Sequence, residues 1–104
     1  MVNRLDIVIF GATGYTGKLL VKNAIHMCKD QNLKFGIAGR RKAALEAVIQ
    51  EFASDNEIIP IILADVNNEE SFHKMTEQTK ILINCCGPYK YIFLHLYRNY
   101  LEVY

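Results

Sequence analysis

The sequence lacks the features that mark several large classes of protein. No run of apolar residues reaches the roughly 18 that a membrane span requires. Asp6 interrupts the apolar stretch near the N-terminus, so the start of the chain does not resemble a signal peptide. The net charge of +1 favours neither nucleic acid nor a membrane surface as a partner. We therefore expect an intracellular protein with no transmembrane segment and no nucleic-acid partner.

Cysteine and metal-ligand patterns are also sparse. The three cysteines, Cys28, Cys85 and Cys86, are odd in number and form no C-x-x-C pair. We interpret them as reduced, small apolar residues. None of the three histidines is placed to activate Cys86 as a nucleophile, and no metal-ligand spacing is present. The sequence thus predicts neither a metal site nor cysteine-based catalysis.

The most informative stretch is a glycine-rich turn near the start of the chain. A short apolar run ends at Gly11, Gly14 and Gly17 follow at three-residue spacing, and an amphipathic pattern begins. A dinucleotide site needs this order at the end of the first Rossmann strand. Gly11 allows a sharp turn, Gly14 allows a pyrophosphate to approach the backbone, and Gly17 allows the helix to pack closely. The alternative is a glycine-rich turn between two core elements, which explains less well why three glycines share it.

We predict that this turn and the first N–H groups of the following helix hold a pyrophosphate, aided by the helix dipole. The predicted contact residues are Gly11, Thr13, Gly14, Tyr15, Thr16 and Gly17.

Strand and helix patterns alternate along the chain, giving βαβαβαβ and hence a parallel sheet with right-handed crossovers. We expect an α/β, Rossmann-type sheet of about four strands. It is an incomplete doubly wound domain, because 104 residues are too few for both halves. Asn67 is the predicted N-cap of the third helix, followed by Glu70 three residues later. The expected strands are 5–10, 33–38, 58–64 (well paired from Pro60) and 80–85, and the expected helices are 16–29, 42–52 and 68–78.

Periodicity also predicts which helix faces are buried. The third helix is expected to bury Phe72 and Met75. The first helix is expected to bury a four-residue row with two neighbours close by: Leu20, Ala24 and Cys28, with Leu19 and Met27.

Two arginines follow the second predicted strand, where an NAD site would place an acidic residue for the ribose 2′-hydroxyl. Arg40 and Arg41 cannot accept from a hydroxyl, but a guanidinium fork matches a 2′-phosphate. The alternative is a solvated basic helix start, which the helix dipole disfavours. Residues 1–50 carry +5 and residues 51–104 carry −4, so the positive half holds the glycine turn. We therefore favour NADP (NADPH) over NAD as the cofactor.

The ends of the third and fourth strands complete the predicted site, because ligands of open α/β sheets bind at the carboxyl ends of the strands. Asp65 and Val66 are predicted to face the adenine, although Asp65 could equally cap the turn. Cys86 and Gly87 would lie along the nicotinamide side. No Tyr-x-x-x-Lys acid/base pair follows the fourth strand, so the catalytic residues remain unknown.

Four strings together resemble the saccharopine dehydrogenase-like oxidoreductases: 9–17 (IFGATGYTG), 38–41 (AGRR), 64–66 (ADV) and 84–89 (NCCGPY). The resemblance covers about residues 5–89, the N-terminal NADP-binding part of that family. It implies hydride transfer, with a larger region completing the sheet and the second domain. Animal relatives are associated with lipid droplets and other membranes and with glycolipid metabolism, and a mitochondrial location is less favoured. Atypical short-chain dehydrogenases share the glycine string, but the 84–89 string argues against them.

The stretch after Tyr89 departs from the family pattern. Residues 90–104 are rich in aromatic side chains and contain no glycine or proline. We expect a partial Rossmann domain over 1–89 and an atypical tail over 90–104, as in a truncated isoform or a fragment. The alternatives to an enzyme are a nucleotide-binding module without turnover and a product that folds poorly. An unpaired sheet edge and the apolar tail would favour self-association.

Overall fold

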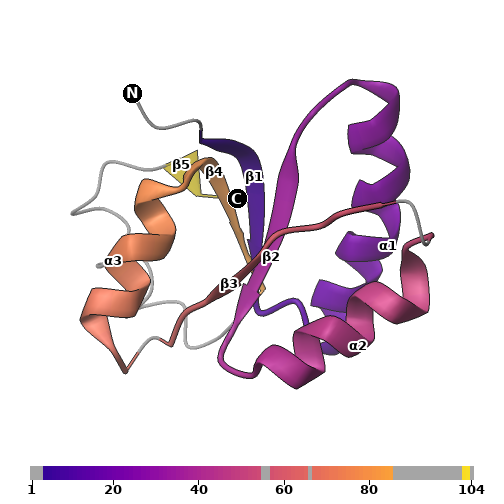
Figure 1. The fold of residues 1–104 in the computed structure, drawn as a ribbon. Coiled ribbons are helices and arrows are strands. Elements are labelled where there is room, and N and C mark those ends of the chain that lie inside the picture. Colours follow the sequence, from indigo (N-terminus) through magenta and orange to yellow (C-terminus); the bar gives the residue numbers. More distant parts are fainter. Residues whose placement is uncertain (1–3, 55–56, 66, 86–101, 104) are drawn as a thin grey trace.

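Strands and helices alternate in the computed structural model, which describes residues 4–54, 57–65, 67–85 and 102–103 (Figure 1). All neighbouring strands pair in parallel, in the order β3-β2-β1-β4-β5. The predicted Rossmann-type parallel α/β sheet is confirmed. The elements are β1 (Leu5–Phe10), α1 (Tyr15–Asp30), β2 (Phe35–Gly39), α2 (Lys42–Phe52), β3 (Ile61–Leu63), α3 (Glu69–Glu77), β4 (Thr79–Asn84) and β5 (Glu102–Val103).

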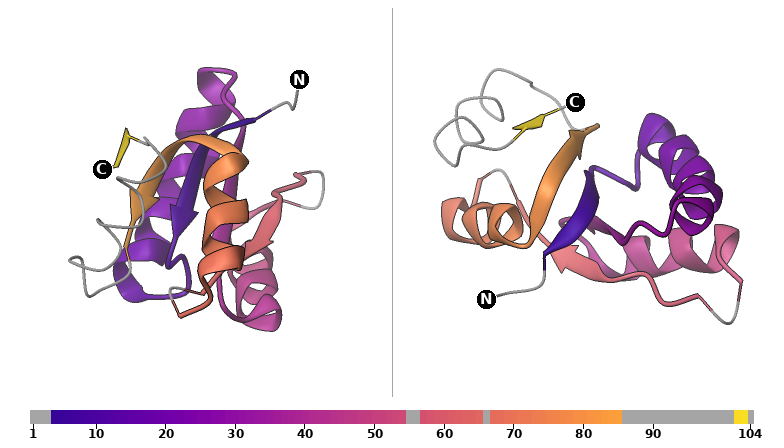
Figure 2. Two further views of the ribbon diagram at one scale, coloured as in Figure 1. Left: turned by 90° about the vertical axis from the view of Figure 1, so that its left-hand side faces the viewer. Right: turned by 90° about the horizontal axis from the view of Figure 1, so that it is seen from above.

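Helices cover both faces of the sheet. Figure 2 shows α1 and α2 on one face and α3 on the other. The chain moves from β1 outward to β3, and α3 then returns it to β4 on the other side of β1. The strand order thus reverses between β1 and β4, where Phe10 and Asn84 are in register. In open α/β sheets, ligands bind outside the carboxyl ends of the strands at this reversal.

The core beneath α3 is built around two aromatic rings. Phe10 of β1 and Phe72 of α3 meet edge to face, with ring centroids 5.4 Å apart and planes at 86°. Both are almost fully buried, as is Met75. The predicted burial of Phe72 and Met75 is therefore confirmed. This contact fixes α3 over the centre of the sheet.

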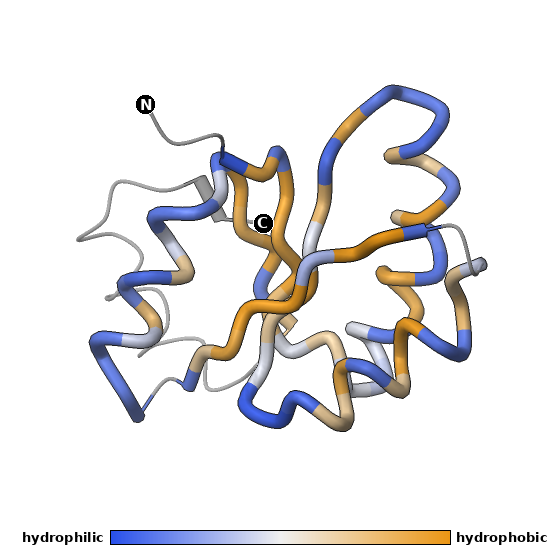
Figure 3. The backbone as a smooth tube through the Cα atoms, in the orientation of Figure 1, coloured by the Kyte–Doolittle hydropathy of each residue, from blue (hydrophilic) through white to orange (hydrophobic). Residues whose placement is uncertain are grey.

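The core beneath α1 and α2 is aliphatic. Leu45 and Val48 of α2 pack with residues of α1 and of the sheet, including Ile9 and Ile37. Figure 3 shows hydrophobic residues concentrated along β1, β3 and β4, whereas the helices alternate between hydrophobic and hydrophilic residues. The sheet is apolar on both faces because helices cover both, as expected for parallel strands.

The buried face of α1 agrees with the predicted row at Cys28 and differs from it at other positions. Leu19 and Met27 are 47% and 58% exposed, and Leu20 and Ala24 are only half-buried. The close contact of Gly17 with the preceding turn sets the rotation of the helix, so a neighbouring stripe faces the sheet. The buried residues of α1 are Gly17, Val21, Ile25 and Cys28.

The start of α3 also corrects the prediction. The N-cap is Asn68, whose side chain accepts a hydrogen bond from the backbone N–H of Ser71 at 3.0 Å. The backbone N–H of Asn67 instead donates to Asp65 Oδ1 at 2.9 Å. This Asx turn occupies the residue that was expected to cap, so the helix begins one residue later.

Two strands begin later than expected because the flanking residues contribute no backbone N–H group to the sheet. The backbone N–H of Leu33 donates to Cys28 O at 2.7 Å, closing the end of α1, where Asn32 has a φ of 55°. The backbone N–H of Lys34 donates to Asp6 Oδ2 at 2.8 Å. Pro60 has no N–H, although its carbonyl oxygen accepts from Ile37 at 3.0 Å. Regular pairing therefore starts at Phe35 in β2 and at Ile61 in β3.

A short fifth strand joins the four that the sequence predicts. Glu102 and Val103 pair in parallel with Ile81 and Leu82, so β5 covers part of the outer edge of β4. These two residues belong to the stretch 90–104, the rest of which lies outside the described residues. The edge of β4 is thus not left open along these two positions.

Two further predictions concern the membrane and the cysteines. Among the described residues, no helix combines the length and apolar character needed to cross a bilayer. Cys28 carries a free thiol, as expected, and Cys86 lies outside the described residues.

Candidate functional site

The glycine turn lies at the carboxyl end of β1 and is held by hydrogen bonds to the neighbouring strand. Gly11 has a φ of 82°, a conformation that side-chain-bearing residues rarely adopt. The backbone N–H groups of Gly11 and Ala12 both donate to the carbonyl oxygen of Ala38, at 3.0 and 3.4 Å. The turn is therefore fixed against β2 before any ligand binds.

Gly17 and Gly14 have opposite surroundings. A Cβ placed on Gly17 would lie 2.8 Å from Ala12 Cα, closer than real contacts allow. A Cβ on Gly14 would meet only the carbonyl oxygen of Gly11, at 3.7 Å. Gly17 is thus required for packing α1 against the turn. At Gly14, which is exposed, a side chain would be tolerated by the protein, and its absence leaves space in front of the helix accessible to a ligand.

The first turn of α1 presents backbone N–H groups to that space. Gly14 is the N-cap and has no side chain to accept from them, and no acidic residue lies in the first helical turn. Thr13, Gly14 and Thr16 are exposed, and Tyr15 is 83% exposed. N–H groups without a side-chain cap among the described residues, together with the positive end of the helix dipole, make this a place where an anion is stabilised.

The two arginines lie beside this turn. β2 ends at Gly39, two residues before Arg41, which is the N-cap residue of α2. Both arginine side chains are exposed, and no hydrogen bond or ion pair of either is found within the described part of the chain. Since Ala38 pairs with Phe10, Arg40 follows the sheet at the same edge as the glycine turn. Two cations without a partner among the described residues therefore lie on the edge of the sheet that carries the glycine turn.

Asp65 has a structural role in the turn before α3. Its Oδ1 accepts from the backbone N–H of Asn67, and its own N–H donates to Ser71 Oγ at 3.1 Å. Of the two roles predicted for Asp65, facing the adenine or capping the turn, Oδ1 therefore has the capping role. Asp65 is half-buried, at the end of β3 that pairs beside Gly39. It therefore lies on the same edge of the sheet as the arginines.

The remaining predicted positions lie around the end of β4. The backbone N–H of Cys85 donates to the carbonyl oxygen of Phe10 at 2.9 Å, which ties the end of β4 to β1. Val66, Cys86 and Gly87 lie outside the described residues. No cluster of potential metal ligands is present in the part of the chain that the structure describes.

One residue of the turn was not singled out by sequence. Ala12 is fully buried, and its Cα forms the surface on which Gly17 packs. A larger side chain at position 12 would have to displace the core under α1. The signal was available in principle, because a small residue follows directly after the first glycine.

These elements define the class of protein: a parallel α/β chain of the Rossmann type with a glycine-rich turn between its first strand and first helix. Solved structures share this fold. A short-chain dehydrogenase/reductase from Veillonella parvula matches with a TM-score of 0.71 at 17% identity, over 96% of this chain and 45% of that one. Saccharopine dehydrogenase (L-Glu forming) from Saccharomyces cerevisiae matches with a TM-score of 0.70 at 17% identity, over 95% and 21%.

Sequence relatives narrow the class to a family. A lipid droplet localized protein of Caenorhabditis elegans is 32% identical over 93 residues, covering 86% of this chain and 22% of the relative. A saccharopine dehydrogenase-like oxidoreductase of Mus musculus is 30% identical over 95 residues, covering 82% and 22%. A "probable mitochondrial" saccharopine dehydrogenase-like oxidoreductase of Arabidopsis thaliana is 33% identical over 92 residues, covering 82% and 20%.

No family model matches the chain. The pairwise relationships nevertheless show that it belongs to the saccharopine dehydrogenase-like oxidoreductases. It spans about a fifth of the length of the curated relatives that it matches.

Proposed function

We propose that this chain is the NADP-binding part of a saccharopine dehydrogenase-like oxidoreductase. Residues 1–89 form its partial Rossmann unit, and residues 90–104 form a tail outside the family pattern. The observation that carries the proposal is the exposed N-terminus of α1 at Gly14, where no side chain caps the N–H groups, on the same edge of the sheet as two arginines that have no partner among the described residues. This surface offers hydrogen-bond donors and positive charge. A dinucleotide pyrophosphate has the negative charge and the acceptor oxygens that would pair with them.

Each part of the site has a separate task in binding. The backbone from Gly11 to Gly17 holds the pyrophosphate, with Thr13, Tyr15 and Thr16 at the surface around it. Arg40 and Arg41 bind the 2′-phosphate and so select NADPH over NADH, because guanidinium groups pair with phosphate in a bidentate manner.

The adenine and nicotinamide ends of the cofactor are assigned to the other strand ends. Asp65 and Val66 face the adenine, and Asp65 would use Oδ2, since Oδ1 accepts from Asn67. Cys86 and Gly87 lie along the nicotinamide. A bound nicotinamide dinucleotide supplies hydride transfer, and the role of this chain is to hold and orient it.

The second candidate is a nucleotide-binding chain without turnover. The observation that favours it is the short span, about a fifth of the relatives. Orienting a hydride acceptor requires a substrate pocket around the nicotinamide, and the rest of the family architecture would supply it. We expect that the 104-residue chain alone binds NADPH and shows no NADPH-dependent turnover.

We further propose that the activity concerns lipid or glycolipid metabolism at a lipid-droplet or membrane surface. The support is the family resemblance together with the name of the nematode relative. The plant relative is named as probably mitochondrial, which makes the mitochondrion the competing location. Imaging of a fluorescent fusion beside lipid-droplet and mitochondrial dyes separates the two, and mitochondrial signal alone would contradict the proposal.

Titration of the purified chain with NADPH and NADH tests the cofactor assignment. Each charge-assisted bond lost to the 2′-phosphate costs about 1.5–3 kcal/mol, or roughly 10- to 150-fold in affinity. We expect Arg40→Ala with Arg41→Ala to weaken NADPH binding by at least that factor and to leave NADH binding unchanged. Lys22→Ala on α1 removes a charge elsewhere and serves as the control. Equal affinities of the unaltered chain for both cofactors would contradict the proposal.

A further inference from the structure

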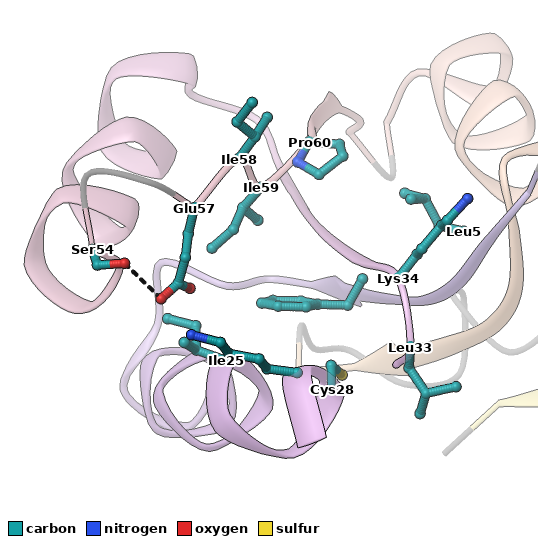
Figure 4. Close-up of a pocket in the computed structure, with 12 residues that line it drawn as sticks. Leu5, Ile25, Cys28, Leu33, Lys34, Ser54, Glu57, Ile58, Ile59 and Pro60 are labelled. Carbon is teal, nitrogen blue, oxygen red and sulfur yellow. Dashed lines mark hydrogen bonds between the residues drawn. The ribbon is translucent and has the colours of Figure 1, made fainter. Parts of the chain in front are cut away.

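A hollow of about 520 Å³ lies at the end of the sheet opposite the glycine turn (Figure 4). It is bounded by the last turn of α1, the start of β2 and residues 57–60, which lead into β3. We call it the amino-end hollow, because β1 and β2 begin beside it. Its volume falls within the roughly 300–1,000 Å³ of small-molecule sites. No task in the proposed dinucleotide site accounts for it.

The inner wall of the amino-end hollow is apolar and belongs to the core. Ile25 and Cys28 of α1 line it together with Ile59, and all three are buried. Figure 4 shows Leu5 and Leu33 at one end of the hollow and Ile59 at the other. Because the wall is made of packed core side chains, the hollow keeps its shape without a ligand.

Large aliphatic side chains also lie exposed at the mouth. Ile58 is 94% exposed and Leu33 is 36% exposed, and both line the hollow. Isolated exposed aliphatic side chains are ordinary, but these two lie at opposite ends of one hollow, so each extends its apolar inner wall to the surface. The preferred ligand therefore has an apolar chain.

The charged residues at the mouth determine which sign of charge on a ligand is favoured. Lys29 and Lys34 line the hollow, and neither ammonium group is within ion-pair distance of a carboxylate among the described residues. Glu57 is the one acidic residue of the lining, and it accepts a hydrogen bond from Ser54 Oγ at 2.8 Å. The lining thus has two lysines against one carboxylate. The nearby Asp6, which also interacts electrostatically with Lys34, forms an ion pair with Lys80, so the charge balance at the mouth stays positive and favours an anionic ligand.

The thiol of Cys28 acts as part of the apolar wall. Burial raises its pKa, and the negative charge of Asp6 raises it further, so the sulfur stays protonated at neutral pH. Since the thiolate is the nucleophilic form, binding in the hollow is non-covalent.

We propose that the amino-end hollow binds an alkyl carboxylate, with its chain against Ile25, Phe35 and Ile59 and its carboxylate at Lys29 and Lys34. This site is independent of the dinucleotide site, because the two lie at opposite ends of the parallel strands. An alkyl carboxylate could therefore bind with or without NADPH present.

Nuclear magnetic resonance of the ¹⁵N-labelled chain tests the proposal with octanoate, octan-1-ol and octylamine as probes. We expect octanoate to cause saturable amide shifts around Leu33, Phe35 and Ile59, and octylamine to bind at least tenfold more weakly. From hexanoate to octanoate to decanoate, affinity should rise about fourfold for each added methylene until the hollow is full. Octanoate affinity should be the same with saturating NADPH.

Two pairs of variants locate the binding. Lys29→Gln with Lys34→Gln should remove the preference for octanoate over octan-1-ol, whereas Lys22→Gln on the same helix should keep it. Ile58→Gln should weaken all three probes, whereas Met27→Gln, also exposed but outside the hollow, should not. All these side chains are exposed, so the fold should survive each change.

The proposal is overturned by absence of saturable shifts, by equal affinity for octylamine and octanoate, or by an octanoate affinity that is unchanged in Ile58→Gln. Any of these results would leave the dinucleotide assignment untouched, because NADPH binding is measured separately at the glycine turn.

Discussion

At the scale of single residues, the glycines of the turn differ in what their missing side chains allow. A Cβ on Gly17 would overlap the backbone of Gly11 and Ala12, whereas a Cβ on Gly14 would make only one ordinary van der Waals contact. The same substitution should therefore have different consequences at the two positions. At Gly17 it should disturb the fold, and at Gly14 it should disturb the ligand.

Gly14→Val should abolish NADPH binding and leave the helix content nearly intact, because its side chain would fill the space proposed for the pyrophosphate. Gly17→Val is the comparison, and it should lower the free energy of unfolding because the valine overlaps the Ala12 backbone. Cofactor titration and circular dichroism measure both effects. If Gly14→Val binds NADPH as tightly as the parent chain, the turn is not the site.

Asp6 links stability to acid pH. The backbone N–H of Lys34 donates to its carboxylate and Lys80 Nζ lies 3.4 Å from Oδ1, and together these lower the pKa of Asp6 below 3.8. A carboxyl with a depressed folded-state pKa stabilises the fold above its unfolded pKa. That contribution is lost as the pH falls through the folded-state value.

We therefore expect the free energy of unfolding to fall as the pH drops below about 4, partly through Asp6. Asp6→Asn should reduce the slope of stability against pH in this window and leave the slope above pH 5 unchanged. Urea unfolding at several pH values measures the slopes. An unchanged acid slope in Asp6→Asn would show that this carboxylate is not coupled to folding.

At the scale of elements, the start of α3 shows how a neighbouring turn moves a helix cap. Asn67 and Asn68 are adjacent and have the same side chain, but only Asn68 accepts from the helix N–H of Ser71. The Asx turn of Asp65 uses the backbone of Asn67 and not its side chain. The two asparagines thus form a matched pair for measuring how much the N-cap side chain contributes to the free energy of unfolding.

Asn68→Ala should lower the free energy of unfolding by about 1 kcal/mol, the usual cost of losing an N-cap side chain. Asn67→Ala should cost much less, because its side chain makes no hydrogen bond found among the described residues. Thermal or urea denaturation of both variants provides the comparison. Equal losses would mean that Asn68 is not the energetically important cap.

At the scale of the whole molecule, the edges of the sheet bear on self-association. β5 covers two residues of β4, and β3 is the other edge, with Leu63 51% exposed at its end. Unpaired edge strands with exposed apolar side chains favour pairing with a second copy. We propose that the chain self-associates through the edge of β3.

Leu63→Lys should shift the chain toward monomer, because a lysine on an edge strand opposes pairing. Leu19→Lys is the matched control, since Leu19 is exposed to a similar degree, 47%, on α1. Light scattering over a range of protein concentrations distinguishes the two. A monodisperse monomer in the unaltered chain, or an equal effect of both variants, would contradict association through β3.

Local sequence by itself determined the alternation of strands and helices, the bounds of β1 and α2, and the glycine turn. These features depend on the apolar pattern and on the missing side chains of glycine, and both act within a few residues. The sequence also predicted that Arg40 and Arg41 lie at the same edge of the sheet as the glycine turn, because the carboxyl ends of parallel strands share one edge.

Only the tertiary structure decided the features that depend on residues distant in sequence. The contact of Gly17 with Ala12 sets the buried stripe of α1 and leaves Leu19 and Met27 exposed. The bond from Lys34 to Asp6, 28 residues away, delays the start of β2. The amino-end hollow combines α1, β2 and the approach to β3. Packing between separate segments creates such features, so no local pattern carries their signal.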